Sequence, residues 1–273
     1  MRCAIDILDL VARMKAEGAP FALATVVRTV AATAAKAGAK AVILPDGTVT
    51  GGWIGGGCAR AAVLKAARDA LADGRPRLVS VQPPDVLQEQ GIAAGDEREG
   101  VRFVKNMCPS EGTMDVFVEP LLPQPQIVVC GASPVAVAVA DLGRRIGFAV
   151  TVCAPADDQP AFAEADQRIE GVAPPLHDRA SRYVVVSTQG RGDEAALDAA
   201  LAIETDYVTF VGSRKKAKAL KATLAERGVP AERLARLKVP AGLDIGAIGP
   251  EEIALSILAE IVCLRRRGQP RGG

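Results

Sequence analysis

The stretch Ile127-Val-Val-Cys130-Gly131-Ala-Ser133-Pro134-Val-Ala136 decides how the second half of the chain folds. A short apolar run ends at Gly131, and Pro134 opens a helical pattern, because proline is favoured in the first turn of a helix. A glycine turn between a strand and a helix is the position of the G-x-G-x-x-G dinucleotide fingerprint. Only its first glycine remains, since Ser133 replaces the second and Ala136 the third, and the acidic residue expected after the next strand is missing. We therefore predict a Rossmann-like fold that does not bind NAD(P) well.

Outward from that stretch, strand and helix patterns alternate to the end of the chain. Such alternation predicts a parallel, doubly wound sheet. The expected strands are Ile127–Cys130, Phe148–Cys153, Tyr183–Ser187 and Tyr207–Val211, and the expected helices are Pro134–Ile146, Gly192–Ala202 and Ser213–Arg227. Upstream, three prolines within Glu119–Gln126 are typical of a linker. We predict two domains, residues 1–122 and 123–273.

The first half predicts a smaller α/β domain. A helix is expected over residues 3–17, and another after the glycine run at residues 55–57. The expected strands are Phe21–Val30, Ala41–Leu44, Thr48–Thr50, Arg77–Val81, Val101–Lys105 and Thr113–Glu119. Residues 83–100 are polar and mixed, and no element is assigned to them.

Composition excludes several classes of function. The 33 Lys+Arg residues balance 32 Asp+Glu, and aromatics make up 3% of the chain, so no nucleic-acid surface is expected. The single histidine, His177, excludes clustered histidine metal sites and is expected on the surface. The chain shows neither a membrane-spanning run nor a signal-peptide pattern, and its six cysteines form no C-x-x-C pair. We expect a cytoplasmic protein with reduced thiols.

Two of the cysteines lie in turns that could hold a functional thiol. In Gly55-Gly56-Gly57-Cys58 the glycines expose backbone N–H groups at a helix start, and the helix dipole favours the thiolate. That chemistry suits a nucleophile, a soft-metal ligand or a persulfide carrier; the alternative is a tight turn before a small buried cysteine. Cys108 lies in a loop between strands, where structural need for cysteine is weak. Packing accounts for the remaining four, which are Cys3, Cys130, Cys153 and Cys263.

Two further turns are expected at the ligand-binding edge of the second sheet. Ser187–Asp193, which contains Gln189, is polar, glycine-rich and near the expected topological switch point. Gly212-Ser213-Arg214-Lys-Lys216 combines a helix cap with three cations. This second turn is either a phosphate site or an ordinary solvated helix start.

Four segments together resemble the XdhC/CoxI family, the accessory factors of xanthine dehydrogenase and related molybdenum hydroxylases. Gly55–Cys58 is similar to the S-G-G-C element of the family, and Cys108–Leu121 to its cysteine and glycine element followed by a strand ending in Glu-Pro-Leu. Tyr207–Lys216 matches the Gly-Ser-Arg turn, and Pro240–Ile261 is the most specific match. The segments occur in the family's order over nearly the whole chain.

The resemblance implies a small N-terminal domain joined to a Rossmann-like domain, usually in a homodimer. It implies an accessory chaperone, rather than an enzyme with catalytic residues, that binds molybdenum cofactor, protects it, assists its sulfuration with a cysteine desulfurase and delivers it to an apo molybdenum hydroxylase. The cofactor that the resemblance implies is a molybdopterin in the mononucleotide or the cytosine dinucleotide form. The residues that we assign to cofactor binding are Gly56, Gly57, Cys58, Cys108, Gly131, Ser133, Gln189, Gly212, Ser213 and Arg214, with Cys58 as the metal ligand.

Some residues depart from the family's pattern and leave alternatives open. Arg60 occupies a position where the family often has an acidic residue, and Gly131–Pro134 and Thr188–Asp193 look closer to the carbon monoxide dehydrogenase accessory branch. One alternative function is an NAD(P)-dependent oxidoreductase with a degenerate Rossmann motif. Another is a sulfur or copper relay that works through Cys58 alone.

Overall fold

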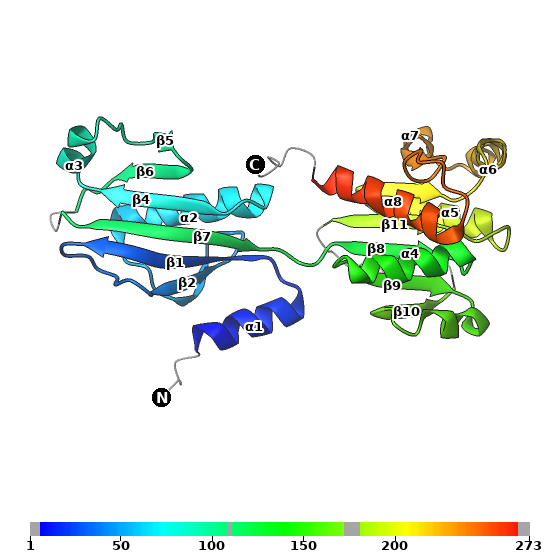
Figure 1. The fold of residues 1–273 in the computed structure, drawn as a ribbon, viewed down its shortest axis with the longest axis horizontal. Helices are drawn as coiled ribbons and strands as arrows, with labels where there is room; N and C mark the ends of the chain where they lie inside the picture. Colours follow the sequence, from blue (N-terminus) through cyan, green and yellow to red (C-terminus); the bar gives the residue numbers. More distant parts are fainter. Residues whose placement is uncertain (1–5, 109–110, 172–180, 267–273) are drawn as a thin grey trace. The chain divides into compact units, whose positions relative to one another are not determined.

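The chain forms two compact units, Met1–Pro123 and Gln124–Gly273 (Figure 1). The structure is a computed structural model that describes residues 6–108, 111–171 and 181–266, with the backbone alone at Cys58. The division lies one residue beyond the boundary expected from the prolines. His177 and Cys3 lie outside the described residues.

The C-terminal unit is a parallel sheet with helices on both faces. Its strands are β8 (Gln126–Cys130), β9 (Ala149–Ala154), β10 (Gln167–Glu170), β11 (Arg182–Val186), β12 (Tyr207–Phe210) and β13 (Leu237–Lys238). They lie in the order β10-β9-β8-β11-β12-β13, and every neighbouring pair is parallel. This is the strand order of the Rossmann fold, with the topological switch point between β8 and β11. The predicted fold class is confirmed.

Helices cover the two faces of this sheet because successive strand residues point to opposite sides. The helices are α4 (Pro134–Arg145), α5 (Asp193–Ala202), α6 (Arg214–Glu226), α7 (Ala231–Arg236) and α8 (Pro250–Arg265), with a 3-10 helix, η1, at Ala156–Phe162. Ile127 and Val129 pack in a core with α4 and α8, whereas Val128 and Cys130 pack in a core with α5, α6 and α7.

The N-terminal unit is built on a mixed sheet. Its strands are β1 (Phe21–Val30), β2 (Lys40–Ile43), β3 (Val49–Gly52), β4 (Arg77–Gln82), β5 (Glu97–Arg98), β6 (Val101–Lys105) and β7 (Thr113–Leu121), in the order β3-β2-β1-β7-β4-β6-β5. Only the β4–β6 pair is parallel among these strands. The helices are α1 (Ile7–Glu17), α2 (Gly57–Asp73) and α3 (Pro84–Glu89).

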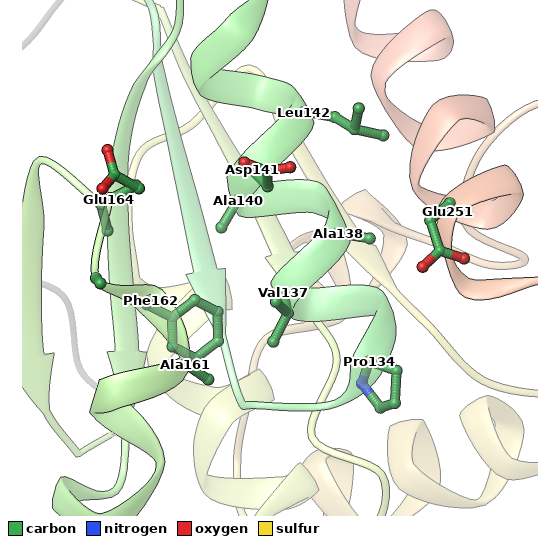
Figure 2. Close-up of a pocket in the computed structure, with 12 residues that line it drawn as sticks. Pro134, Val137, Ala138, Ala140, Asp141, Leu142, Ala161, Phe162, Glu164 and Glu251 are labelled. Carbon is green, nitrogen blue, oxygen red and sulfur yellow. The ribbon is translucent and has the colours of Figure 1, made fainter.

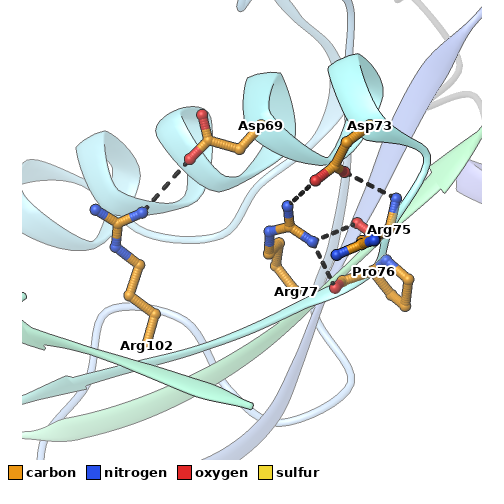
Figure 3. A network of polar contacts seen from close by, with 6 residues as sticks. All are labelled: Asp69, Asp73, Arg75, Pro76, Arg77 and Arg102. Atoms are coloured by element: carbon orange, nitrogen blue, oxygen red, sulfur yellow. Dashed lines mark hydrogen bonds and ion pairs between the residues drawn. The ribbon is translucent and has the colours of Figure 1, made fainter. Parts of the chain in front are cut away.

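Helix α2 covers one face of this sheet and carries the glycine–cysteine turn at its N-terminus. Its apolar residues Val63, Ala67 and Ala70 are fully buried in a core that the sheet residues of this face complete. Polar contacts hold its C-terminal half: Arg102 of β6 contacts Asp69 at 3.4 Å, and Arg77 of β4 pairs with Asp73 (Figure 3). These contacts fix the C-terminal end of α2 on the sheet.

The structure corrects the predicted linker. Strand β7 continues through Pro120 to Leu121, so only residues 122–125 connect the two units. Pro120 pairs with Ala22 of β1, but the pairing between β7 and β4 ends at Val118. A proline is tolerated there because that side of β7 needs no further N–H donor.

Two other expectations change. Residues 83–100, to which no element was assigned, contain α3 and β5. Cys263 is exposed, so the prediction that packing accounts for it is wrong. The buried side of α8 includes Ile257, Leu258 and Ile261, and a residue two positions beyond Ile261 points away from that side at 100° per residue. Among the described residues, no helix is both long and apolar enough to cross a membrane.

The prediction that packing accounts for Cys130 and Cys153 is confirmed. They are register partners on β8 and β9 and are fully buried. The hydrogen bond with Cys153, together with burial, raises the pKa of the Cys130 thiol well above its usual value. A thiol that stays protonated in the core is unreactive, because the thiolate is the nucleophile and the metal ligand.

Candidate functional site

A pocket of about 370 Å³ lies at the N-terminal end of α2. Three segments and two strand residues form it. They are Ala32, Thr33, Ala34, Gly55, Gly56, Gly57, Ala59, Val81, Asn106, Met107, Cys108, Gly112 and Met114. Two of the sequence-predicted elements, the glycine turn and the Cys108 loop, therefore meet at one cavity of the N-terminal unit.

The glycine turn forms one wall and needs glycine at two positions. Gly55 and Gly57 have φ values of 98° and 56°, in the left-handed region that disfavours other residues. Gly56, the N-cap residue of α2, is extended and offers no side-chain hydrogen bond to the helix. Cys58 follows as the second residue of α2, between the lining residues Gly57 and Ala59. The first turn of α2 thus presents backbone N–H groups without a side-chain cap beside the pocket.

The Cys108 loop also lines the pocket and is held by Asn106. The Asn106 side chain donates to Gly112 O at 2.7 Å and accepts from Cys108 N at 3.0 Å. The backbone N–H of Asn106 also donates to Gln82 O at 2.6 Å, which fixes the loop to the end of β4. Asn106 therefore positions the exposed Cys108 at the edge of the cavity.

Backbone strain borders the same pocket. Ala31 and Glu111 have φ values of 60° and 49°, which residues other than glycine rarely adopt. The strained segments are joined by a bridge between Ala32 and Glu111. A Cβ on Gly112 would lie 2.2 Å from Ala32 O, so this close approach requires glycine. Strain of this kind is characteristic of ligand sites held in shape by their surroundings.

The lining is neutral, apolar and rich in sulfur. Among the described residues that line it, none is charged, and the Asn106 amide is already engaged by the loop. No group of three or more His, Cys, Asp or Glu residues in the described parts of the chain could hold a metal ion. The pocket is therefore suited to a soft or neutral group rather than to a hard cation held by carboxylates.

In the C-terminal unit, the fingerprint turn is closed by its own contacts. A Cβ on Gly131, whose φ is 107°, would lie 2.5 Å from Ser187 O. The Ser133 and Ser187 hydroxyls are 2.6 Å apart, and Ser133 N donates to Ser187 O at 3.3 Å. The Ser133 hydroxyl also caps α4 by accepting from Ala136 N. The N–H groups that a dinucleotide pyrophosphate would need are partly satisfied within the protein.

The neighbouring turn, which contains Gln189, is organised by Asp193. This carboxylate accepts hydrogen bonds from Gly190 N at 3.0 Å and from the Thr188 hydroxyl, and it pairs with Lys216 at 2.5 Å. Burial alone would raise the pKa of Asp193, but these hydrogen bonds and the Lys216 charge hold it below its usual value. Lys216 therefore neutralises Asp193, and one of the three cations expected to face a phosphate is already paired.

A serine caps the helix at the basic turn, as Ser133 does at α4. Ser213 accepts from Lys216 N at 3.2 Å as the N-cap of α6, and Arg214 is exposed in the first turn. A Cβ on Gly212 would lie 2.4 Å from the ring of Phe210, so this glycine is needed for packing.

The structure divides the predicted site residues into two sets. Gly56, Gly57 and Cys108 line the pocket of the N-terminal unit, with Cys58 in the chain between two lining residues. Gly131, Ser133, Gln189, Gly212, Ser213 and Arg214 follow neighbouring strands at the carboxyl edge of the second sheet.

Asn106, Met107 and Met114 are among the lining residues of the pocket that the sequence did not predict. Asn106 could have been found, because asparagine two residues before a loop cysteine is typical of an Asx turn. The two methionines carry no sequence signal for a site, since a methionine near a strand is ordinarily part of a core.

A second cavity, of about 500 Å³, lies in the C-terminal unit between α4, η1 and α8 (Figure 2). Val137, Leu142 and Phe162 contribute its apolar surface. Two of its carboxylates are paired, Glu164 with Arg144 at 2.8 Å and Asp141 with Arg145 at 3.2 Å. None of the predicted site residues lines this cavity, so it is separate from the candidate site.

Comparison with known proteins gives two family matches. A model described as the XdhC Rossmann domain matches residues 127–261, and one described as the XdhC and CoxI family matches residues 14–82. Together they cover most of the chain and both of its units.

Curated relatives agree with these matches. The chain is 30% identical over 266 residues to the uncharacterized protein YqeB of Escherichia coli, covering 94% of this chain and 46% of YqeB. It is 31% identical over 169 residues to a Bacillus subtilis protein named as a probable xanthine dehydrogenase subunit, covering 57% of this chain and 47% of that protein. The chain thus spans about half the length of the curated relatives it matches.

Among solved structures, a crystal structure described as a xanthine dehydrogenase from Bacillus halodurans aligns with 97% of both chains at 20% identity and a TM-score of 0.46. The family matches in both units, in the order in which the sequence motifs occur, identify the family. The chain belongs to the XdhC and CoxI family.

Proposed function

We propose that this protein is an accessory factor of a molybdenum hydroxylase and holds molybdenum cofactor as its cargo. The observation that carries the proposal is the pocket where the uncapped N-terminus of α2, which bears Cys58, meets the Cys108 loop. Membership of the XdhC and CoxI family supports an accessory role, and the name of the Bacillus subtilis relative points to xanthine dehydrogenase.

The chemistry of the pocket fits such a cargo. A molybdopterin carries an anionic phosphate, which the N–H groups and the dipole at the start of α2 would favour. It also carries a thiophilic metal centre, which suits a thiol beside a sulfur-rich lining. A volume of about 370 Å³ lies within the range of ordinary ligand pockets. Cys58 would hold the metal centre, and Asn106 would keep Cys108 in place in the pocket lining.

We propose a carrier rather than an enzyme. The described pocket lining offers no charged side chain that could act as a general acid or base. The client would be a hydroxylase such as xanthine dehydrogenase or carbon monoxide dehydrogenase, and a cysteine desulfurase would supply sulfur to the bound cofactor. We further propose that the protein works as a homodimer, which its mass in solution would test.

The closed turn at Gly131 argues against the alternative, an NAD(P)-dependent oxidoreductase. Its Ser133 N–H group already donates to Ser187 O, and Asp158, one of the carboxylates that follow β9, pairs with Arg191 at 3.2 Å. Titration with NAD(H) and NADP(H) by calorimetry is expected to show no binding at micromolar concentrations. Micromolar or tighter binding would favour the oxidoreductase.

Cofactor retention tests the proposal. The protein is purified anaerobically from a host that produces molybdenum cofactor, and bound pterin and molybdenum are measured per chain. We expect both to be present in the parent protein and to be lost in Cys58→Ala. Although the sequence assigns Ser213 to cofactor binding, its hydroxyl caps α6 in the other unit and does not line the pocket, so we expect both to remain in Ser213→Ala. Absence of pterin and molybdenum from the parent protein would refute the proposal.

A further inference from the structure

Four large apolar side chains are exposed close together at the start of α8 in the C-terminal unit. They are Leu243, Ile245 and Ile248 of the preceding loop and Leu255 of the helix, and we call them the α8 patch. Ile248 is 88% exposed, the highest value among the large apolar residues that the structure describes. Single exposed apolar residues are ordinary, whereas a group of them on one surface is typical of a protein interaction site.

We propose that the α8 patch is a docking surface for a protein whose contact face is apolar and rimmed by lysine or arginine. The proposed function, on which this part of the inference rests, identifies that protein as the client hydroxylase.

Contacts at both ends hold the loop against the first two turns of α8. Leu243 N donates to Ser256 O at 3.2 Å, and a Cβ on Gly242 would lie 2.2 Å from Ser256 Oγ. At the other end of the loop, Ile248 N donates to Glu252 Oε2 at 2.8 Å. The apolar residues of the loop therefore lie beside the helix residues that neighbour the fourth member of the patch.

A polar cluster beneath the loop fixes it further. Lys238 forms an ion pair with Glu260 of α8, and its ammonium also donates to Gly242 O at 3.3 Å. The Tyr207 hydroxyl of β12 donates to Glu260 at 2.6 Å. The loop is thus tied to both the sheet and the helix. A surface held in this way loses little conformational entropy when a partner binds, which favours affinity.

The patch continues into the cavity between α4, η1 and α8. Leu255 follows Glu251 by four residues, so the two side chains lie on the same face of α8. Glu251 lines the cavity of about 500 Å³ together with Ala138 and Leu142 of α4 (Figure 2). An apolar side chain of a partner that covers the α8 patch therefore has a hollow beside the patch to enter.

The charge of this surface determines the kind of partner. Residues 241–255 contain three acidic residues, Asp244, Glu251 and Glu252, and no lysine, arginine or histidine. All three are exposed, and hydrogen bonds from the backbone N–H groups of Ile248 and Gly249 hold the pKa of Glu252 below its usual value. Complementary charge at an interface steers association and selects partners, so the partner must supply cations around its apolar face.

The same charge disfavours the other occupants. A nucleic acid or an anionic membrane surface would be repelled by the three carboxylates. A second copy of this chain in a two-fold contact would place the same acidic surface against itself. A different protein with a basic rim is the occupant that remains.

Binding of the full chain to apo xanthine dehydrogenase, measured by surface plasmon resonance, tests the inference. This hydroxylase is the probe because the name of the Bacillus subtilis relative points to it. Ile248→Ser and Leu255→Gln change exposed side chains and should each weaken binding at least about tenfold, as truncation of central interface residues does. Ile146→Ser is the matched control, because Ile146 is 48% exposed at the end of α4 and outside the patch. Parent-like affinity in both patch variants, or no binding by the parent protein, would overturn the inference.

The acidic rim gives a second readout. Glu251→Gln should slow association and make the association rate less dependent on ionic strength, whereas Glu232→Gln on α7 should leave both unchanged. An association rate that does not respond to Glu251→Gln would contradict the basic rim of the partner. If Ile248→Ser instead converts a dimer of the parent protein into monomers, the patch is a contact between two copies and the inference is overturned.

The inference and the cargo proposal can fail separately. Weakened docking of the patch variants in a protein that never retains pterin would refute only the cargo proposal. Retention of pterin and molybdenum together with parent-like docking of both patch variants would refute only the assignment of the α8 patch.

Discussion

Two glycine turns in this molecule lead from a strand to a helix, and they differ in whether the protein's own side chains close them. At α4 the turn is closed, because Ser133 caps the helix and Gly131 is pressed against Ser187 of the neighbouring turn. At α2 the turn is open, because Gly56 supplies no capping side chain and the turn borders a cavity.

The difference shows which features of a glycine turn indicate a ligand. The turn at Gly131 has the sequence position expected of a binding site, yet several of its polar groups already bond within the protein. The turn at Gly56 lies in a unit without the Rossmann topology, yet no side chain at its N-cap position bonds to the helix, and we propose that its N–H groups bind the cargo. An unsatisfied helix start beside a cavity is better evidence for binding than the resemblance of a loop to a known fingerprint.

The largest expected effect comes from adding one methyl group to the closed turn. Gly131→Ala should lower the free energy of unfolding of the C-terminal unit by about 3 kcal/mol, through its positive φ and the contact with Ser187 O. Gly56→Ala is the matched control in the open turn, where nothing lies within 4 Å of the added Cβ. Thermal unfolding by circular dichroism measures the change, while fluorescence of Trp53 follows the N-terminal unit. Equal losses in the two variants would remove the distinction between the turns.

A smaller effect is expected where Asp193 organises the second turn of the closed edge. Asp193→Asn should cost about 2 kcal/mol at pH 7, because it removes the charged partner of Lys216. The pKa of Asp193 is lowered in the folded protein, so its ionised form contributes stability above about pH 4, and that contribution is lost as the pH falls through the folded pKa. Denaturation measured between pH 3 and 7 should show that the free energy of unfolding falls less steeply with acid in Asp193→Asn than in the parent protein. An unchanged pH profile would contradict this role.

The Cys108 loop, which lines the same pocket as the open turn, is held by Asn106. Asn106→Ala should cost the N-terminal unit about 1 kcal/mol, because it removes the hydrogen bonds to Gly112 O and Cys108 N. Asn106→Asp keeps the acceptor for Cys108 N, so the stability of this variant should lie between that of the parent protein and that of Asn106→Ala. Urea unfolding followed by Trp53 fluorescence measures both. If Asn106→Ala is as stable as the parent protein, the loop does not depend on this side chain.

The smallest effect on stability should accompany a clear effect on binding. Gly56→Ser gives α2 the capping side chain that it lacks and should stabilise the N-terminal unit by a few tenths of a kcal/mol, roughly the difference between Ser and Gly caps. The same hydroxyl would occupy N–H groups that we assign to the cargo, so retention of pterin and molybdenum should fall. Unchanged retention would place the cargo away from this helix start.

The fold could be predicted from local patterns, whereas the site could be predicted only in part. Apolar runs separated by helical patterns predict the Rossmann sheet, because the alternation of strand and helix patterns is visible in the local sequence. The link between Gly55–Gly57 and Cys108 depends on tertiary contacts, such as the approach of Gly112 to Ala32. The contacts that close the Gly131 turn could not be predicted for the same reason. They come from Ser187, which is more than 50 residues away in the sequence.

Protection of cysteines on cargo loading tests the central claim most directly. Protein with and without bound molybdenum cofactor is treated with an alkylating reagent, and the modification of each cysteine is quantified by mass spectrometry. We expect loading to protect Cys58 and Cys108 and to leave the exposed Cys263 as reactive as before. Equal modification of Cys58 and Cys108 in the loaded and unloaded protein would contradict it.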